Sequence, residues 1–251
     1  MAGVFPALAA PRPDCAGPVE VAGARVVRVE RNGVLVLADG RAVVLEGIRL
    51  NRAQSGGNAY AAAPETLAAL RALIARGPGT FTALRPKEDR YDRIRAQGFV
   101  DGIWMQAALL EQGLARAAPS PDRGECAALL ADIEARGRAR HPGAPGVVSA
   151  VRRPQDMAGT IGTFQVVEGW ITNVGRSGAR VFLDFGEDRQ RGFSATIAPE
   201  DRARFRGLDL DALVARHVRI RGMVEDGRGR PQIALSTPDQ IEFLDGARRP
   251  H

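Results

Sequence analysis

Arginine is the residue type through which this chain could bind an anion. The chain has 35 basic residues, of which Lys87 alone is a lysine, and its formal net charge is +6. A guanidinium group suits bidentate contacts with phosphate and offers no lone pair to a metal ion. The charge favours nucleic acid, DNA or RNA, as the partner. A membrane surface or an acidic protein is the alternative, and a GC-rich coding sequence would produce the same arginine bias.

The candidate residues in the first half of the chain lie in two short stretches. Arg49 and Arg52 follow Gly47-Ile48, and Arg90 and Arg93 belong to the sequence Asp89-Arg90-Tyr91-Asp92-Arg93. An arginine alone can hold a phosphate, but it does not activate water. For Arg93 the plain alternative is an exposed arginine after a turn.

The elements that must position these arginines begin with the stretch 25–52. Its β-branched runs are interrupted by Asn32-Gly33 and Asp39-Gly40, which are strong signals for tight hairpin turns. We therefore predict strands at 26–29, 34–37 and 43–45, with Ile48 following.

This stretch resembles the opening of the staphylococcal nuclease (thermonuclease) family. That family reads roughly V-x-D-G-D-T-L-x-L-x-D-G and then V-R-L-x-G-I-D-x-P-E, and its D-R-Y-G-R motif is similar to residues 89–93, with Asp92 in place of glycine. The resemblance implies a calcium-dependent phosphodiester hydrolase built on an OB-type barrel.

The positions that carry the family's chemistry are substituted here. Against the family pattern, Gly33 and Arg49 stand at the calcium-ligating aspartates, Val44 at a phosphate-binding arginine, Asn51 at the proline and Arg52 at the general base. Only Arg93 matches a functional position. Calcium needs several oxygen ligands, so we expect no metal and no cofactor. A general base contributes about 10²–10⁴-fold, so we expect little or no hydrolysis.

The order of elements predicts an α+β protein that is mostly β. A helix that begins at Pro64-Glu65 ends at Gly77-Pro78, strands follow at 80–84 and 94–100, and two helices come after Trp104, which we expect in the core. Three strands, a helix and two strands is the order of an OB-type barrel. We predict two tandem five-stranded OB-type barrels, the first resembling staphylococcal nuclease with C-terminal helices.

Composition predicts four segments. Residues 1–20 form a signal-like or disordered segment, 21–141 the nuclease-like domain, 142–160 a Pro- and Gly-rich linker and 161–246 the second barrel. His141 is expected to be a solvated side chain in this linker region.

The second half resembles the small OB-like domains that follow degenerate thermonuclease domains in some bacterial proteins. The resemblance rests on G-W-I-T-N-V-G, V-F-L-D-F-G, V-R-I-R-G, G-R-P-Q-I and P-D-Q-I-E-F-L. We predict strands at 163–174, with a bend at Gly169, and at 180–185, 193–197, 216–225 and 232–235.

A nucleic-acid-binding face in this half would combine aromatic rings with arginines. The candidates are Trp170, Phe182 and Phe193 with Arg180, Arg191, Arg219, Arg221, Arg228 and Arg230. Alternation along the strand places Arg219 and Arg221 together on one exposed face. In the alternative interpretation the arginines pair with Asp and Glu, and the two phenylalanines fill the barrel.

The N-terminus and the cysteines bear on localisation. MAGVFPALAA resembles the end of a secretory signal, although no basic residue precedes its apolar run. Either a longer signal begins upstream and the protein is exported to the periplasm or medium, or the segment is a tail of a cytoplasmic protein. Cys15 and Cys126 could pair in an oxidising compartment, which would stabilise the fold by about 4–5 kcal/mol. No stretch approaches the roughly 20 apolar residues of a membrane span.

Three functions are consistent with these residues. The first is an exported nucleic-acid-binding pseudonuclease in which Arg49, Arg52 and Arg93 form a phosphate cradle. The second is a working nuclease that uses displaced carboxylates at Glu30, Asp39, Glu46 or Asp92. The third is a protein-binding or cell-envelope adaptor, in which both barrels are scaffolds.

Overall fold

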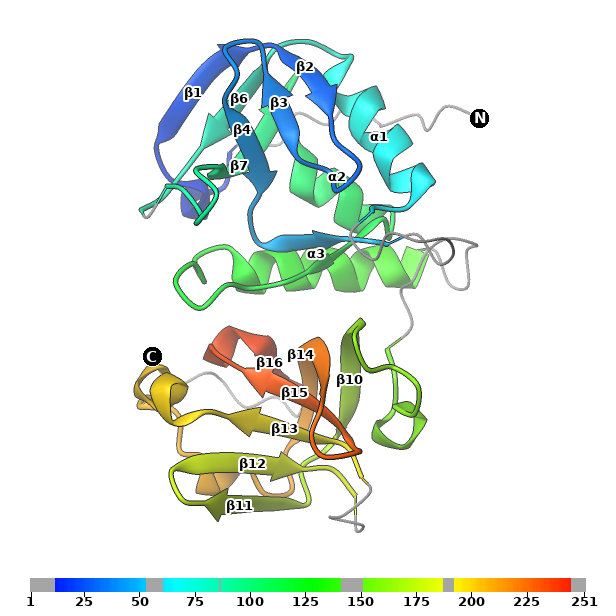
Figure 1. Ribbon diagram of the computed structural model, residues 1–251, viewed down its shortest axis with the longest axis vertical. Coiled ribbons are helices and arrows are strands. Elements are labelled where there is room, and N and C mark those ends of the chain that lie inside the picture. Colours follow the sequence, from blue (N-terminus) through cyan, green and yellow to red (C-terminus); the bar gives the residue numbers. More distant parts are fainter. Residues whose placement is uncertain (1–11, 53–60, 86, 141–150, 187–191, 245–251) are drawn as a thin grey trace. The chain divides into compact units, whose positions relative to one another are not determined.

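The chain forms two compact units. A computed structural model describes residues 12–52, 61–85, 87–140, 151–186 and 192–244 (Figure 1). The first unit comprises Met1–Ala117 and Arg123–Ser149, and the second comprises Ala118–Asp122 and Ala150–His251. The chain belongs to the predicted α+β class, because strands predominate and helices accompany them. Each large sheet has seven strands and not the predicted five.

The first unit contains the longer helices. Its strands are β1 (Val19–Ala24), β2 (Val26–Val29), β3 (Leu35–Leu37), β4 (Ala42–Leu45), β5 (Ile48–Leu50), β6 (Gly79–Thr82), β7 (Ile94–Val100), β8 (Ile103–Trp104) and β9 (Ala115–Ala117). Its helices are the 3-10 turn η1 (Asp14–Ala16), α1 (Pro64–Ile74), α2 (Met105–Glu111) and α3 (Ala127–Arg140). A seven-stranded sheet runs in the order β1-β6-β7-β4-β3-β2, with β8 on β7, while β5 pairs with β9.

The second unit repeats this strand order with short 3-10 turns in place of α-helices. Its strands are β10 (Phe164–Trp170), β11 (Asn173–Ser177), β12 (Arg180–Asp184), β13 (Ser194–Ile197), β14 (His217–Asp226), β15 (Pro231–Leu235) and β16 (Ile241–Phe243). Its 3-10 turns are η2 (Pro154–Asp156), η3 (Pro199–Phe205), η4 (Asp211–Leu213) and η5 (Pro238–Gln240). The sheet order is β10-β14-β15-β13-β12-β11, with β16 on β14.

The two sheets share their pairing pattern as well as their order. In the first unit β4 runs parallel to β7, and in the second β13 runs parallel to β15, while the remaining ladders in both sheets are antiparallel. The strands at the two ends of each path are neighbours in sequence: Arg25 alone separates β1 from β2, and Ile171 and Thr172 separate β10 from β11.

The predicted hairpins of the first unit are present. Gly33 and Gly40 have φ of +86° and +88°, which glycine adopts without strain, and they lie in the turns that flank β3. The Asp39 carboxylate accepts a hydrogen bond from the Arg41 backbone N–H at 3.0 Å. Strand β1 was not predicted, because its Gly- and Ala-rich sequence has no strong alternation.

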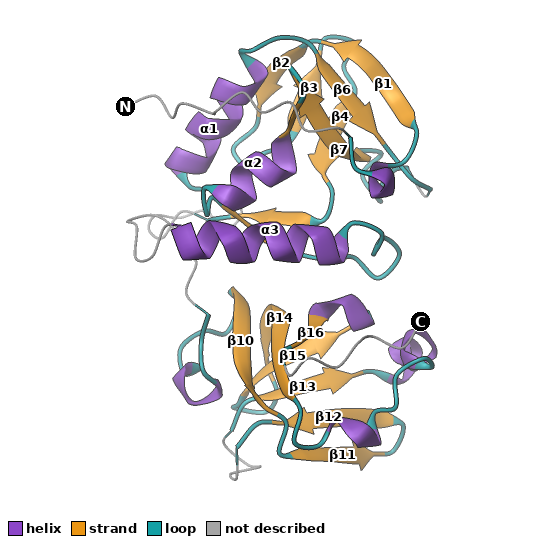
Figure 2. Cartoon of the chain, turned by 180° about the vertical axis from the view of Figure 1, so that it is seen from behind, coloured by secondary structure: helices purple, strands orange, loops and turns teal. Residues whose placement is uncertain are grey.

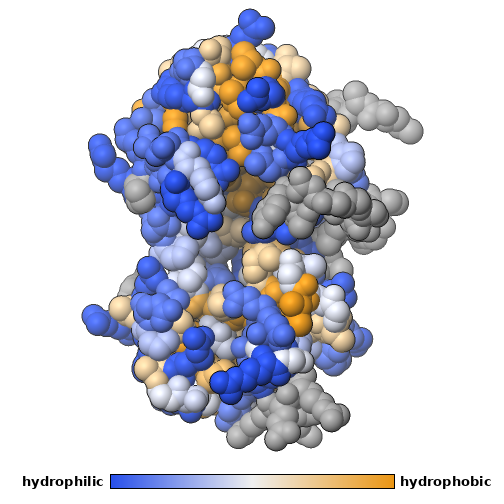
Figure 3. Space-filling model, viewed as in Figure 1, coloured by the Kyte–Doolittle hydropathy of each residue, from blue (hydrophilic) through white to orange (hydrophobic). Residues whose placement is uncertain are grey.

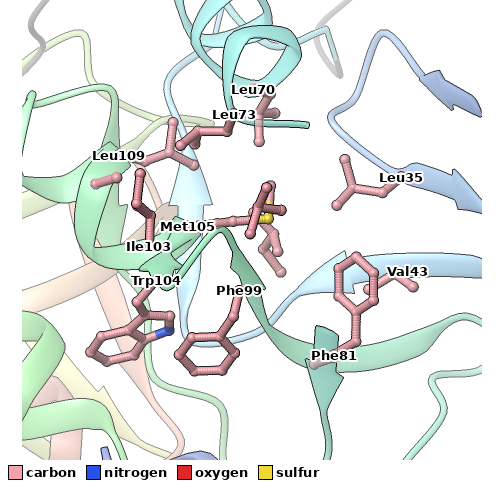
Figure 4. Close-up of a cluster of buried hydrophobic side chains, with 14 of the residues drawn as sticks. Leu35, Val43, Leu70, Leu73, Phe81, Phe99, Ile103, Trp104, Met105 and Leu109 are labelled. Carbon is pink, nitrogen blue, oxygen red and sulfur yellow. The ribbon is translucent and has the colours of Figure 1, made fainter. Parts of the chain in front are cut away.

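The core of the first unit lies between the sheet and the helices. Leu70 and Leu73 of α1 and Met105 of α2 are fully buried and face Phe81 of β6 (Figure 4). Figure 2 shows α1 and α2 on the same side of the sheet. Trp104 is 7% exposed, which confirms its predicted place in the core. It lies in β8 and not in the following helix.

The second unit has a separate core. Phe193 is 2% exposed, as the barrel-filling interpretation predicts, and Phe182 is half-buried. The predicted bend at Gly169 is wrong, since β10 continues to Trp170. Part of the expected linker belongs to this unit, because Met157 is 1% exposed and packs in its core.

The beginning of the described chain is tied to the first unit. Cys15 and Cys126 form a disulfide with a Cα–Cα distance of 5.2 Å across a sequence separation of 111, and Ala16 is 1% exposed. Residues 12–20 are therefore structured, contrary to the prediction of a signal-like or disordered segment. The expected signal MAGVFPALAA and His141 lie outside the described residues.

The face of the molecule shown in Figure 3 is mostly hydrophilic. Apolar residues gather on the first unit, and a smaller apolar group lies on the second unit. Among the described helices, none combines the length and apolar character that crossing a bilayer requires.

Candidate functional site

The first unit brings its arginines together at one corner of the sheet. The chain turns at Gly47, whose φ is +79°, and continues as β5, where Arg49 lies opposite Arg116 of β9. Parallel pairing of β4 with β7 sets Val43 opposite Ile94 and Val44 opposite Arg95. The residue that precedes β7, Arg93, therefore lies beside Ala42 at the beginning of β4.

These elements enclose a pocket of about 190 Å³, which we call the arginine pocket. It is lined by Arg49, Arg52 and Arg93 together with Asn32, Gly33, Val34, Val44, Leu45, Ile48, Leu50 and Ala62. Among these described lining residues there is no carboxylate. The geometry thus unites the three arginines proposed from the sequence as a phosphate cradle.

Electrostatics make this pocket suitable for an anion. Burial lowers the pKa of Arg49, and the positive charge of Arg52 lowers that pKa further. Both effects mean that the charged guanidinium is less stable here than in water. A bound anion would offset the repulsion between the two arginines.

A rigid turn positions Arg93. The Asp89 carboxylate accepts hydrogen bonds from the Tyr91 N–H at 2.9 Å and from Arg93 Nε at 2.8 Å. Asp92 has a φ of +57°, a backbone conformation that glycine adopts more readily than other residues. Burial raises the pKa of Asp89, but the hydrogen bonds from Arg93 and the two backbone amides outweigh it, so the pKa lies below its usual value.

Arg90 is not part of the arginine pocket. Its side chain is exposed, and its guanidinium lies over the ring of Tyr91 at 4.8 Å, as does that of Arg93. Tyr91 is 59% exposed and was not singled out from the sequence. Its position between Arg90 and Arg93 could have indicated this contact, because guanidinium groups stack on aromatic rings.

The residues around the pocket do not fit calcium. A Cβ atom added to Gly33 would lie 2.1 Å from Leu50 Cδ1, so Leu50 occupies the space that a longer side chain at position 33 would need. Among the described lining residues, Asn32 alone has a side-chain oxygen, and this Oδ1 accepts a hydrogen bond from the Val34 N–H at 3.1 Å. One amide oxygen beside three guanidinium groups does not supply the several oxygen ligands that calcium needs.

The displaced carboxylates considered for hydrolysis lie elsewhere. Glu46 is 7% exposed and binds Arg95 through contacts of 2.8 and 3.1 Å. Glu30 pairs with Arg28 and Asp39 with Arg41, while Asp92 is exposed. None of these four carboxylates lines the pocket.

No family model and no curated protein matches this chain. The evidence for its candidate sites therefore comes from the arrangement of its own side chains.

In the second unit Arg219 and Arg221 do not form the predicted exposed face. Arg221 is 1% exposed and contacts Glu242 at 3.0 Å. Arg219 binds Glu242 at 2.8 Å and Glu168 at 2.7 Å. The two arginines are paired because β10 and β16 flank β14. Glu168 of β10 and Glu242 of β16 lie opposite Arg219, and Glu242 also reaches Arg221.

Other candidates from the second half do converge. A pocket of about 540 Å³, here called the hairpin pocket, is lined by Ser177, Arg180, Phe182, Asp226, Gly227, Arg228, Arg230 and Gln232. The Arg230 guanidinium lies 6.0 Å from the centre of the Phe182 ring. Arg191 lies outside the described residues.

Proposed function

We propose that this protein binds single-stranded nucleic acid or a similar polyanion, and that the arginine pocket holds a backbone phosphate without cleaving it. The observation that carries this proposal is the convergence of Arg49, Arg52 and Arg93 on a pocket whose described lining contains no carboxylate. Arginine forks match phosphate oxygens in geometry and charge. Without an oxygen ligand set or a general base at the pocket, binding is the chemistry that these residues support.

The strand pattern supports a further part of the proposal, that each large sheet is an OB-type barrel. In each unit the two end strands of the sheet path are consecutive in sequence, as expected if one bent strand closes a barrel. The parallel pairs β4–β7 and β13–β15 occupy equivalent places. OB-type barrels commonly bind oligonucleotides near the loops that correspond to the β2–β3 turn of the first unit and the β11–β12 turn of the second.

The hairpin pocket supports nucleic acid over a simple anion. Phe182 supplies an aromatic surface, and Arg180, Arg228 and Arg230 supply positive charge in the same pocket. Basic grooves with aromatic rings hold single strands of any sequence, because every base can stack. In the first unit, exposed Tyr91 lies beside Arg93 in a similar combination.

We also propose that the protein is exported. The Cys15–Cys126 disulfide supports this, because structural disulfides persist in oxidising compartments and are rare in the cytosol. Mass analysis of the mature protein from fractionated cells would test this: a periplasmic or secreted form with the intact disulfide supports export, and a reduced cytosolic form contradicts it.

A binding assay tests the main proposal. Fluorescence anisotropy with a labelled oligothymidylate would compare the wild type with Arg49→Gln, and with Arg71→Gln as a control of equal charge change, because Arg71 lies on the exposed face of helix α1. Losing a charged hydrogen-bond donor at the phosphate should weaken binding about 10- to 100-fold. Arg71→Gln should change it much less. Equal effects of the two variants would contradict a specific pocket.

A nicking assay tests the absence of cleavage. Plasmid and heat-denatured DNA would be incubated with the protein in calcium, with and without a chelator. We expect both substrates to stay intact. Chelator-sensitive cleavage that disappears in Glu46→Gln or Asp92→Asn would establish a nuclease with displaced carboxylates instead.

A further inference from the structure

The second unit contains a cleft that is separate from both arginine-lined pockets. Its volume is about 820 Å³, its lining is mostly apolar, and Trp170, Pro154 and Phe185 contribute to it. Trp170 is 56% exposed, whereas the other tryptophan of the chain, Trp104, is 7% exposed. We call it the tryptophan cleft.

The indole of Trp170 is held in one orientation. Trp170 of β10 lies directly opposite His217 of β14, and their rings stack with centroids 4.7 Å apart and planes inclined by 13°. The His217 ring is itself 3.4 Å from the Glu168 carboxylate. A pre-oriented aromatic ring loses little side-chain freedom when it binds a second ring.

One wall of the cleft is formed where the Gly169 backbone packs closely against the side chains of Pro154 and Phe185. A Cβ atom added to Gly169 would lie 2.7 Å from Pro154 Cγ and 3.3 Å from Phe185 Cδ1. Glycine at this position therefore allows the η2 turn to approach β10, and the apolar wall is already formed without a ligand.

The charged rim of the cleft is basic on balance. Arg152 and Arg153 are exposed lining residues. Arg152 Nε donates a hydrogen bond to the neutral Gln165 side chain at 3.3 Å, whereas Arg153 forms an ion pair with Asp156 at 2.9 Å. The lining carboxylate, Glu168, is bound by Arg219 at 2.7 Å. The rim can therefore accept an anionic group beside the aromatic wall.

The cleft and the hairpin pocket have different linings but are neighbours. Phe182 lines the hairpin pocket, and Phe185, three residues further along the chain, lines the cleft. Three residues span at most about 10 Å, so the cleft is a distinct site close to the hairpin pocket.

We infer that the tryptophan cleft is a base-stacking subsite for single-stranded nucleic acid, in which one nucleobase lies on the exposed indole of Trp170 and its phosphate lies near Arg152 and Arg153. The inference rests on the proposed function and adds a contact outside both arginine-lined pockets. A planar aromatic ring with an attached anion matches the cleft: the ring meets the indole, and the anion meets the basic rim.

Intrinsic fluorescence tests this inference, because Trp104 is buried and Trp170 is exposed. Titration with unlabelled oligothymidylate should quench the emission of the wild type, and in Trp170→Phe the remaining Trp104 emission should stay constant. Trp170→Ala should weaken binding about 5- to 150-fold, the range for one lost base stack. Trp170→Phe, which keeps an aromatic ring, should retain most of the affinity.

The outcomes separate this inference from the proposed function. If the wild type does not bind the oligonucleotide, the proposed function fails and the inference fails with it. If the wild type binds and Arg49→Gln weakens binding, but Trp170→Ala binds as tightly and wild-type emission is unchanged, only the inference is overturned. Circular dichroism of Trp170→Phe and Trp170→Ala verifies that both variants fold. If only Trp170→Ala is unfolded, the fluorescence of the other two proteins tests the inference. Quenching of the wild type with constant emission from Trp170→Phe supports it, and unchanged wild-type emission overturns it.

Discussion

The arginine pocket and the hairpin pocket lie at corresponding corners of two sheets with the same strand order, but they differ in composition. The first lies between the β2–β3 turn and the residue before β7, and the second between the β11–β12 turn and the β14–β15 turn. The arginine pocket has three arginines and no aromatic residue among its described lining. The hairpin pocket adds Phe182 and a carboxylate, Asp226.

This difference indicates how one topology can serve two kinds of contact. The smaller pocket, of about 190 Å³, suits a compact phosphate, and the larger one, of about 540 Å³, has room for a base. The shared strand order places loops at this corner in both units. Under the proposed function, the side chains on those loops decide which part of a nucleotide each corner binds.

The two units also differ in what stabilises them. The first has a disulfide and a nearly buried Glu46–Arg95 pair, and the second depends on the Glu168, Glu242, Arg219 and Arg221 network. Hydrogen exchange of the backbone amides in β7 and in β14 can report the stability of the first and the second unit separately within the full chain.

The largest effect should follow from removal of the disulfide. Replacing both cysteines, Cys15→Ser with Cys126→Ser, frees a loop with a sequence separation of 111 and should lower the stability of the first unit by about 4–5 kcal/mol. Exchange protection should fall in β7 and stay unchanged in β14. Equal losses in both strands would show that the units do not unfold separately.

The buried ion pairs should give the next largest effects. Glu46→Gln removes the charge of the carboxylate that Arg95 contacts, at a site where the Glu46 and Arg95 side chains are 8% and 13% exposed, and it should cost about 3–5 kcal/mol in the first unit. Glu242→Gln should cost the second unit about 2–3 kcal/mol, because Glu242 is more exposed.

Denaturant unfolding of each variant measures these costs, and Glu30→Gln serves as the control. Its pair with Arg28 lies at the surface, so the change should be at most about 1 kcal/mol. A cost for Glu46→Gln as small as that of Glu30→Gln would contradict a structural role for the buried pair.

Variants of the two pockets should separate stacking from phosphate binding. Phe182→Ala should weaken oligonucleotide binding about 5- to 150-fold without altering its dependence on salt. Arg49→Gln should both weaken binding and flatten the salt dependence, because a phosphate contact releases counterions. Identical behaviour of the two variants in salt-titrated anisotropy would remove the distinction between the pockets.

The smallest effect concerns pH and the turn that positions Arg93. The lowered pKa of Asp89 means that its ionised form is favoured in the folded state. Its contribution is complete above the usual aspartate pKa of about 3.9 and is lost as the pH falls through the lowered value. The pair is partly exposed, so we expect about 1 kcal/mol or less.

Asp89→Asn tests this pH effect. The variant should reduce the loss of first-unit stability below about pH 4, measured by denaturant unfolding at a series of pH values. A wild type and variant with parallel pH profiles would show that Asp89 does not contribute.

Much of the sheet could be predicted from local patterns, whereas side-chain partners could not. Gly33 and Gly40 marked hairpins that the structure contains, and Trp104 lies in the core as expected. Strand β1 was missed because its Gly- and Ala-rich sequence has no strong alternation, and because its partner, β6, is distant in sequence.

The candidate site was predictable to different degrees in the two units. Arg49, Arg52 and Arg93 were proposed together by resemblance, and they line one pocket. Arg219 and Arg221 were misplaced because alternation gives the side of a strand but not the carboxylates that neighbouring strands bring to it.

The central claim, that the arginine pocket binds phosphate through its three guanidinium groups, is tested most directly by one salt titration. Binding of labelled oligothymidylate would be measured from low to high salt in the presence of a chelator, for the wild type and for Arg49→Gln/Arg52→Gln/Arg93→Gln. If each arginine replaces one counterion on a single strand, the slope of log affinity against log salt should be shallower by about 2 in the variant. Equal slopes, or binding by the wild type that the chelator abolishes, would contradict the claim.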